Sequence, residues 1–412
     1  MPSIADYPQR HSLASFQQTP LTELGAGLFA QLGYLNFNYL IGQPYARFAD
    51  LNDSTRLNRA TLTTWAIPTH QIMLDAMRHS ERFARVTWEN WLETCSHRNE
   101  EDFAAITFTL APGVYCVSFR GTTNKLVGWK EDLNMSFMPT IPAQRRALSY
   151  LIKQISQHPG TYYLTGHSKG GSIATYAFDH LPQPLASQVA HVYSFDGPSG
   201  VPLDPSHRDR VTKLVPQSSL IGVSLDPAMN FEVVKSRVKL FGQHDVLTWN
   251  IADTTFAHLP TTTWASRYFQ KTFALWLAGL DAKATAVTVD ALYRILRSGN
   301  AITLDDLAKT KIIGATILGR SGASINIIGN NLAAHSAASS VPWLARWFKR
   351  IKRVTSSADA GLFYYTHGRE SWPNHLHSGQ KLPHILASIQ LILRTSVNNH
   401  PSAMCIKIAS YQ

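Results

Sequence analysis

One short stretch of this sequence restricts the fold more than any other part of the chain. Four strand-forming residues at 162–165 lead directly into Gly-His-Ser-Lys-Gly-Gly at 166–171, and residues 172–178 read as a helix. Gly-x-Ser-x-Gly between a strand and a helix is typical of a sharp turn that lifts a serine hydroxyl out of a sheet. Side chains at Gly166 and Gly170 would collide in such a turn. The pattern therefore favours Ser168 as a nucleophile over Ser168 as a simple helix cap.

Two backbone amides near this turn are predicted to bind an oxyanion. The amide of Lys169 follows the serine and lies in the first turn of the helix, where partial positive charge gathers. A second amide would come from the end of an upstream strand, where Phe-Arg-Gly leads to Thr122. Taken alone, that upstream segment is more typical of an ordinary turn.

The order of the predicted elements favours a mostly parallel sheet flanked by helices. Two strands joined by a tight turn precede a helix that begins at Pro142, and the serine turn follows. Residues 40–100 read as helical patterns, with Trp88, Trp91 and Leu92 in the core. A helix is also predicted after Thr19-Pro20. The predicted strands are Phe103–Leu110, Val114–Phe119, Val189–Phe195, Val211–Val215 and Val233–Phe241, and the predicted carboxyl-terminal helices are Ala265–Leu280, Thr285–Leu296 and Thr303–Leu318.

Polar residues follow the predicted strands at their carboxyl ends, where open α/β sheets bind ligands. Asp196 follows one strand in Phe-Asp-Gly-Pro, and His244 follows another in Gly-Gln-His-Asp. His244 comes last among the candidate site residues, as expected of the general base in an order of serine, acid and histidine, whereas His167 lies on the strained turn and His191 begins a strand at its opposite end. We therefore predict His244 as the base. Asp196 is predicted as the acid, although a carboxylate before Gly-Pro also caps turns.

The composition excludes several classes of protein. The chain has 412 residues, of which 44% are hydrophobic, so we expect a globular protein with a sizeable core. It shows no signal peptide and no run of about 18 uncharged apolar residues, and its three cysteines suit a reducing compartment, so a cytoplasmic protein is expected. The histidines at 375, 377 and 384 lack carboxylate or cysteine neighbours at ligand spacing, so no metal is predicted. The net charge of +11 comes without a recognisable nucleic-acid module, so no nucleic-acid partner is expected.

Five segments occur in an order that resembles one family; they are Phe119–Thr122, Gly128–Asp132, Gly166–Gly171, Phe195–Pro198 and Gln243–Asp245. They are similar to segments of the lipase-like α/β hydrolases of bacteria that are catalogued as a domain of unknown function and that are related to class 3 (fungal-type) lipases. The resemblance covers about residues 6–335. It implies an α/β-hydrolase fold and a serine carboxylic-ester hydrolase that acts on a lipid-like acyl ester without a cofactor.

The resemblance also implies residue roles. Ser168 matches the nucleophile, and Thr122 matches the hydroxyl residue whose amide completes the oxyanion hole with that of Lys169. The acid departs from class 3 lipases, because Lys213 stands where they have an aspartate before a Val-Pro pair. Asp196 is the predicted acid and Asp226 the alternative. Asp245 would point away from His244 in an extended segment.

Two further departures bear on the substrate and on the class of protein. Lys169 replaces the leucine that is usual in class 3 lipases, and we expect its side chain to extend into solvent rather than select anionic substrates. The missing class 3 aspartate leaves open a catalytically inactive scaffold that binds a lipid or a protein partner. A thioesterase or a peptidase would use the same residues.

We predict three regions: a catalytic domain at residues 1–262, a helical extension packed on it at 263–335, and a basic aromatic tail at 336–412. From Ser340 onward there are nine Lys or Arg residues against two Asp or Glu residues. In the segment 341–354 an apolar stripe of Trp343, Leu344, Trp347, Phe348 and Ile351 lies opposite basic residues. Such a helix suits the surface of an anionic membrane. The alternative, which the pattern slightly favours, is that the stripe packs on the protein's own core with the charged residues in solvent.

Overall fold

The computed structural model of the chain describes residues 3–10, 14–41, 47–199, 202–225, 230–278, 281–297, 302–303 and 306. The chain divides into two compact units, Met1–Ala278 and Gly279–Gln412. The predicted tail helix at 341–354 lies outside the described residues, as does all but the start of the helix predicted at Thr303–Leu318. In the second unit the structure describes helix α10 (Ala282–Arg297), which matches the predicted helix there.

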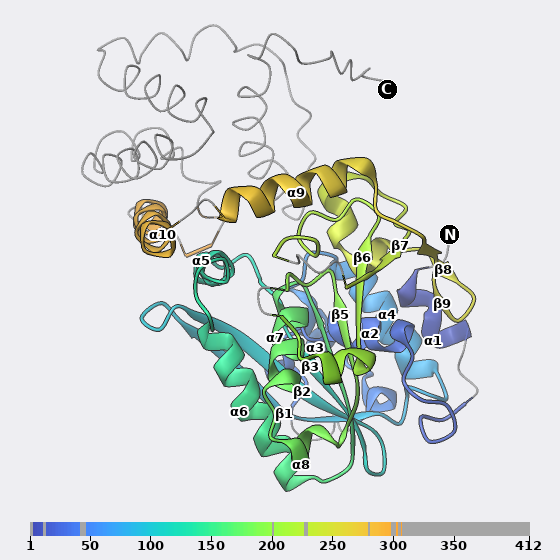
Figure 1. Cartoon of the computed structure of the whole chain (residues 1–412). Coiled ribbons are helices and arrows are strands. Elements are labelled where there is room, and N and C mark those ends of the chain that lie inside the picture. Colours follow the sequence, from blue (N-terminus) through green and yellow to red (C-terminus); the bar gives the residue numbers. More distant parts are fainter. Residues whose placement is uncertain are drawn as a thin grey trace, which may run out of the picture. The chain divides into compact units, whose positions relative to one another are not determined.

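An eight-stranded sheet forms the centre of the first unit, in the order β1-β2-β3-β4-β5-β6-β7-β10 (Figure 1). Strands β3 to β7 run parallel, whereas β1 and β2 at one edge and β10 at the other are antiparallel to their neighbours. The strands of this sheet are β1 (Thr87–Ser96), β2 (Glu101–Ala111), β3 (Val114–Phe119), β4 (Thr161–His167), β5 (Val189–Phe195), β6 (Val211–Pro216), β7 (Glu232–Val234) and β10 (His258–Leu259). A separate two-stranded sheet consists of β8 (Ile251–Ala252) and β9 (Thr255–Phe256).

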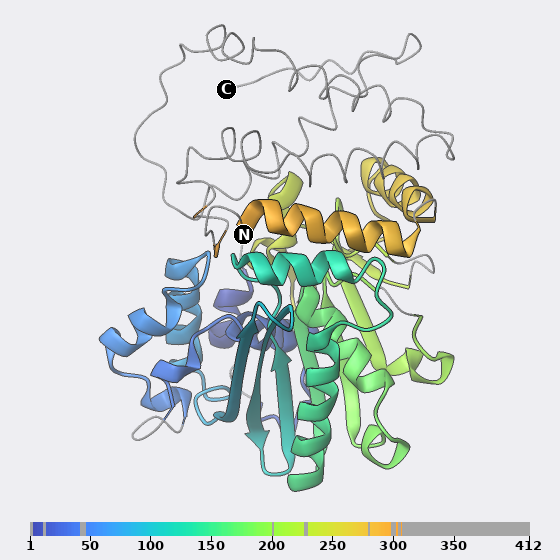
Figure 2. The same cartoon turned by 90° about the vertical axis from the view of Figure 1, so that its left-hand side faces the viewer.

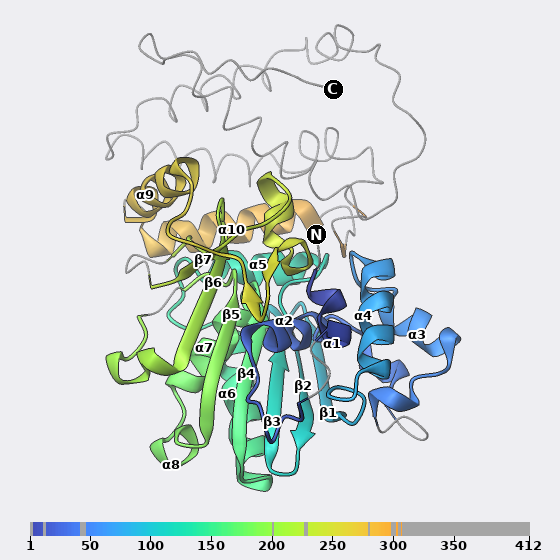
Figure 3. The same ribbon diagram turned by 90° about the vertical axis from the view of Figure 1, so that its right-hand side faces the viewer.

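Helices cover both faces of the large sheet, which confirms the predicted α/β-hydrolase fold class. Figure 2 shows α6 in front of one face, and Figure 3 shows α2 in front of the opposite face. The α-helices of the first unit are α1 (Tyr7–Arg10), α2 (Glu23–Leu32), α3 (Ser54–Thr61), α4 (Ile67–His79), α5 (Leu126–Asn134), α6 (Pro142–Gln157), α7 (Lys169–Asp179), α8 (Gln183–Ala186) and α9 (Trp264–Ala278). Short 3-10 helices are η1 (Ile4–Asp6), η2 (Phe37–Tyr39), η3 (Phe48–Asp50), η4 (Pro205–Arg210), η5 (Leu240–His244) and η6 (Val246–Thr248).

Helix α2 supports the central strands with both apolar and polar contacts. Thr22 caps its first turn by accepting a hydrogen bond from the amide of Gly25, as expected for a helix that begins after Thr19-Pro20. Its leucines are buried in the core. The hydroxyl of Ser118 on β3 donates to a carbonyl oxygen of this helix at 2.7 Å, and that of Thr165 on β4 donates to another at 2.9 Å. These hydrogen bonds fix the helix against the strand that precedes the serine turn.

Two predicted elements differ from the structure. Residues 87–96 form strand β1 rather than a helix, and Leu92 is 37% exposed rather than in the core. The helix-like spacing of Trp88 and Trp91 arises because the pairing of β1 with β2 shifts between Glu89 and Leu92, where a bulge adds a residue to the strand. The strand predicted at 233–241 also ends early, at Val234, so that His244 lies at the end of 3-10 helix η5.

Candidate active site

The turn between β4 and α7 holds Ser168 in an unusual backbone conformation. Its φ is 58° and its ψ is −131°, which is strained for a residue with a side chain. A Cβ atom on Gly166 would lie 2.2 Å from the backbone of Gly170, and one on Gly170 would lie 2.2 Å from the carbonyl oxygen of Phe119. The amide of Ser168 donates to the carbonyl oxygen of Phe195 at 2.8 Å. The turn is therefore closed on both sides by backbone, and only glycine fits at these two positions.

The structure brings His244 and Asp196 together from separate elements. Asp196 directly follows β5 with a φ of 49°, and its side chain is 1% exposed. Its Oδ2 lies 2.7 Å from Nδ1 of His244, whose side chain is 29% exposed. Because a carboxylate oxygen accepts this hydrogen bond, Nδ1 carries the proton and Nε2 keeps a free lone pair. This is the tautomer that a general base requires.

Among the described residues, no hydrogen bond joins His244 to a carboxylate other than Asp196. Lys213, at the position of the class 3 aspartate, donates through Nζ to the hydroxyl of Ser199 at 2.7 Å. Asp245 instead accepts from Nε1 of Trp65 at 3.0 Å and from the amide of Leu247, and so caps helix η6. Asp226 lies outside the described residues.

His167 is buried beside His244 and holds its backbone. Nε2 of His167 donates to the carbonyl oxygen of His244 at 2.7 Å, and Nδ1 accepts from the hydroxyl of Tyr34 at 2.9 Å. The ring centroids of the two histidines are 4.5 Å apart. Burial lowers the pKa of His167 well below its ordinary value. His167 is therefore neutral, and it connects the serine turn to the backbone of His244 at the end of η5. Its partner Tyr34 lies 133 residues away, and no sequence pattern indicated this contact.

The segment Gly121–Thr122 passes directly against the serine turn. A Cβ atom on Gly121 would lie 2.4 Å from the carbonyl oxygen of His167 and 3.2 Å from Cβ of Ser168. The hydroxyl of Thr122 donates to both carboxylate oxygens of Asp132, at 2.7 and 2.6 Å. Burial raises the pKa of Asp132 to about 6, despite the nearby Lys169 ammonium and this hydrogen bond. Asp132 ends one of the five segments noted above, but the sequence alone indicated no role for it.

The prediction that Lys169 extends into solvent is wrong. Its side chain is 1% exposed, and Nζ donates to Oε2 of Glu131 at 2.7 Å and to the carbonyl oxygen of Asp102 at 2.9 Å. Burial lowers the pKa of this ammonium, but the carboxylates of Glu131, Asp132 and Asp102 outweigh burial and hold the pKa above its ordinary value. Because the charge is paired behind the turn, it is not available to bind an anionic substrate. Only the amide of Lys169 can face the site.

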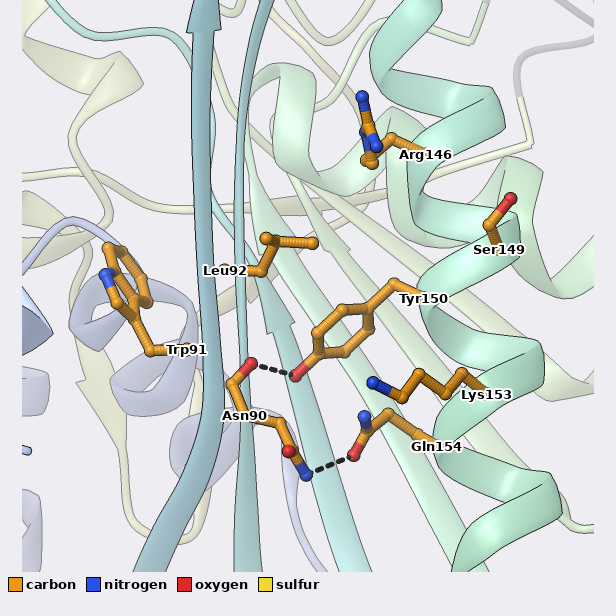
Figure 4. A pocket seen from close by; sticks show the side chains of 8 residues that line it. All are labelled: Asn90, Trp91, Leu92, Arg146, Ser149, Tyr150, Lys153 and Gln154. Atoms are coloured by element: carbon orange, nitrogen blue, oxygen red, sulfur yellow. Dashed lines mark hydrogen bonds between the residues drawn. The ribbon is translucent and has the colours of Figure 1, made fainter.

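A pocket of about 300 Å³ lies elsewhere in the first unit, between the bulge of β1 and helix α6 (Figure 4). The hydroxyl of Tyr150 donates to the carbonyl oxygen of Asn90 at 2.9 Å, and the Asn90 amide donates to Gln154 at 2.9 Å. Of its other polar side chains, Arg146 pairs with Glu101 of strand β2, and Nε1 of Trp91 is buried without a hydrogen-bond partner. None of the residues that line it belongs to the candidate site; they are Asn90, Trp91, Leu92, Arg146, Ser149, Tyr150, Lys153 and Gln154.

Among the described residues, no three His, Cys, Asp or Glu side chains are grouped so that they could hold a metal ion. Within the same residues, every helix is too short or too polar to pass through a bilayer.

The sheet order and the strained serine turn define an α/β-hydrolase fold. The chain belongs to the Mbeg1-like family, whose model matches residues 77–294. This assignment confirms the resemblance noted in the five segments. A search of curated protein sequences finds no match.

Several solved lipase structures resemble the chain at low identity. A fungal lipase is 12% identical and the match covers 60% of this chain and 90% of that one, with a TM-score of 0.36. A mutant form of MDLA from Penicillium cyclopium is 10% identical over 57% and 83% of the two chains, with a TM-score of 0.35. Lipase II from Rhizopus niveus is 16% identical over 37% and 67%, with a TM-score of 0.28. Scores this low give no information on substrate or activity, and the fold is established by the strand order of this chain itself.

Proposed function

We propose that this protein is a serine hydrolase that cleaves an acyl ester of a lipid-like substrate. The observation that carries the proposal is the hydrogen bond of 2.7 Å between the buried carboxylate of Asp196 and Nδ1 of His244, beside the strained turn that presents Ser168. A carboxylate that fixes the tautomer of a histidine next to an activated serine is the arrangement of a catalytic triad. We assign this activity to residues 1–262, with 263–335 as a helical extension and 336–412 as a basic aromatic tail.

In the proposed mechanism, Oγ of Ser168 attacks the acyl carbonyl carbon while Nε2 of His244 takes the hydroxyl proton. Asp196 stabilises the imidazolium that forms. The amides of Thr122 and Lys169 donate to the oxyanion, and the dipole of helix α7 adds to this stabilisation. His244 then returns its proton to the leaving alcohol as the acyl-enzyme forms. In the second half, His244 takes a proton from a water molecule whose oxygen attacks the acyl carbon. His244 then returns this proton to Oγ of Ser168 as the bond between Oγ and the acyl carbon breaks, which releases the acid and restores Ser168.

A fluorophosphonate probe tests the nucleophile without knowledge of the natural substrate. The purified protein should be labelled, and Ser168→Ala should abolish labelling while leaving the thermal transition in place. Ser187→Ala, which removes an exposed hydroxyl bonded only to a carbonyl oxygen, is the matched control and should be labelled fully. A folded wild-type protein that resists labelling would favour a scaffold that binds a lipid or protein partner. Assays with thioester and peptide substrates separate an esterase from a thioesterase or a peptidase.

The acid is tested separately from the nucleophile. Asp196→Asn should lower ester turnover by about 10⁴-fold, because the amide favours the wrong histidine tautomer. Asp226→Asn should leave turnover close to that of wild type. The reverse pattern would assign the acid to Asp226.

We further propose that the segment 341–354 brings the enzyme to an anionic membrane surface. The support is its sequence, in which aromatic and aliphatic residues alternate with Arg346, Lys349, Arg350 and Arg353 at helical spacing. Each basic residue near such a surface contributes about 1 kcal/mol to binding. An acyl hydrolase held at a membrane would meet a lipid-like substrate at high local concentration.

A further inference from the structure

The loop that follows strand β6 surrounds the carboxylate of Asp196 on the side away from His244. Oδ1 of Asp196 accepts a hydrogen bond of 2.5 Å from the hydroxyl of Ser219 and one of 3.0 Å from the amide of Gly222. The same amide also lies 3.0 Å from the Ser219 hydroxyl oxygen. Ser219 is 2% exposed. Oδ1 therefore accepts hydrogen bonds from two buried donors, whereas Oδ2 accepts one from His244.

Gly222 is required for this approach. A Cβ atom at this position would lie 2.2 Å from Oδ1 of Asp196 and 2.7 Å from Cγ1 of Val215. Those distances are far inside van der Waals contact, so any side chain at residue 222 would push the carboxylate or the loop away. The glycine therefore lets a backbone amide reach the acid directly.

Helix α9 holds this loop from its other side. The hydroxyl of Ser266, which is 1% exposed, donates to the carbonyl oxygen of Ser219 at 2.6 Å. Phe269, one turn further along α9, packs against a buried cluster that includes Val223 of the same loop. A continuous chain of hydrogen bonds therefore runs from α9 through Ser219 and Asp196 to the ring of His244.

We infer that Ser219 is a positioning residue for the acid, and that Ser266 of helix α9 fixes Ser219 in turn. This inference rests on the proposed function, because it gives Ser219 a role only if Asp196 acts on His244. A carboxylate with one fixed oxygen cannot rotate, so Oδ2 stays aimed at Nδ1 of His244 throughout the reaction. The loop after β6 does not supply the acid itself, as it does in class 3 lipases. Instead, its Ser219 and Gly222 donate to Asp196, the acid that follows the neighbouring strand β5.

The test replaces Ser219 by alanine in the full-length protein. The rate of fluorophosphonate labelling of Ser168 would be measured from about pH 5 to about pH 9, the range in which histidine titrates, together with kcat and KM for p-nitrophenyl butyrate. We expect labelling rate and kcat to fall about 10- to 100-fold, the effect of one hydrogen bond to a charged group, with KM unchanged because Ser219 touches no substrate. The acid limb of the profile should move to higher pH, because a carboxylate with fewer donors holds the imidazolium proton more tightly.

Companion variants separate positioning from folding. Ser219→Thr keeps the hydroxyl and should recover most of the rate, whereas Gly222→Ala should lower it as Ser219→Ala does. Ser224→Ala is the matched control, because this serine lies on the same loop and its hydroxyl bonds only the carbonyl oxygen of Ile221. Ser266→Ala should lower the rate in the same direction by a smaller factor.

A double-mutant cycle with Asp196→Asn gives the decisive result. If Ser219 acts through Asp196, Ser219→Ala should add little to the loss already caused by Asp196→Asn. An equal loss in both backgrounds, with an unchanged pH profile, would overturn the inference while the proposed function stands. Wild-type labelling and kcat in Ser219→Ala would overturn it as well. A wild-type protein that is not labelled at all would instead overturn the proposed function, and this inference with it.

Discussion

Replacement of Lys169 by methionine should destabilise the first unit strongly, because it breaks an ion pair that is sealed from water. The ammonium lies 2.7 Å from Oε2 of Glu131, and both side chains are at most 1% exposed. Methionine has a similar volume and no charge. The variant would therefore leave the Glu131 carboxylate buried without its cation and would leave the carbonyl oxygen of Asp102 without this donor.

The size of the loss follows from what remains around Glu131. Loss of one partner of a buried ion pair costs about 3–5 kcal/mol. Glu131 keeps two backbone donors, the amides of Ala143 at 2.8 Å and Asp102 at 3.1 Å, which place the expected loss at the lower end, about 3 kcal/mol. For a unit of this size, that corresponds to a fall in Tm of roughly 6–12 °C.

Thermal and urea unfolding followed by circular dichroism would measure this loss. Lys153→Met, on the exposed side of helix α6, is the matched control and should shift the free energy of unfolding by less than about 0.5 kcal/mol. Glu131→Gln added to Lys169→Met removes the unpaired charge and should recover about 1–2 kcal/mol. A loss below about 1 kcal/mol in Lys169→Met, or a double variant less stable than the single one, would refute the reasoning.

Three other predictions concern the turn, the acid near it and the tail. Burial raises the pKa of Asp132 from 3.8 to about 6, so the folded protein loses stability as the pH rises between these two values. The Tm of Asp132→Asn should therefore exceed that of wild type by an amount that grows up to about pH 6 and then stays constant. A difference in Tm that does not depend on pH would contradict this. Gly170→Ala places a Cβ atom 2.2 Å from a backbone oxygen and should lower the free energy of unfolding by more than about 3 kcal/mol. In Gly242→Ala the nearest atom is a side-chain carbon at 3.2 Å, and the loss should be about 1 kcal/mol or less. Similar losses in the two variants would refute the steric argument. Wild-type protein should sediment with anionic vesicles and not with neutral ones, less at high salt, and Trp347→Glu with Phe348→Glu should remain in the supernatant; binding unaffected by these changes would exclude the tail as the contact.

Local patterns in the sequence were sufficient for most of the sheet and its helices. Strands β2, β3, β5 and β6 and helices α2, α6 and α9 lie close to their predicted positions, because alternation, helical spacing and turn residues act over a few neighbouring positions. The serine turn was predictable for the same reason, since strand, glycines and helix are contiguous. Strand β1 was not predictable from local patterns, because its bulge gives the tryptophans a spacing similar to that on one face of a helix.

The environment of the site depended on contacts between distant segments, and no local pattern contains them. The sequence suggested that Asp196 and His244 follow strands, but the hydroxyl of Ser219 and the amide of Gly222 reach the acid from a loop of unremarkable composition. Lys169 looked like a surface lysine because lysine is rarely buried. Its burial depends on tertiary contacts, because β2 supplies the carbonyl oxygen of Asp102 and α5 supplies the carboxylate of Glu131 to its ammonium.

The bulge in β1 also bears on how this protein avoids unwanted association. An outermost strand offers unpaired amides and carbonyls that can recruit a strand from another molecule and begin aggregation. In β1 the extra residue at Asn90, with a φ of 56°, breaks the regular row of these groups. Charged side chains stand on either side of it: Glu89 is exposed, and Glu93 pairs with Arg120 and Lys125. Arg47 pairs with Thr87 at one end of the strand and occupies part of the same edge. A kinked strand edge that carries charged side chains is a poor template for a neighbouring strand, so this side of the sheet is protected against polymer growth.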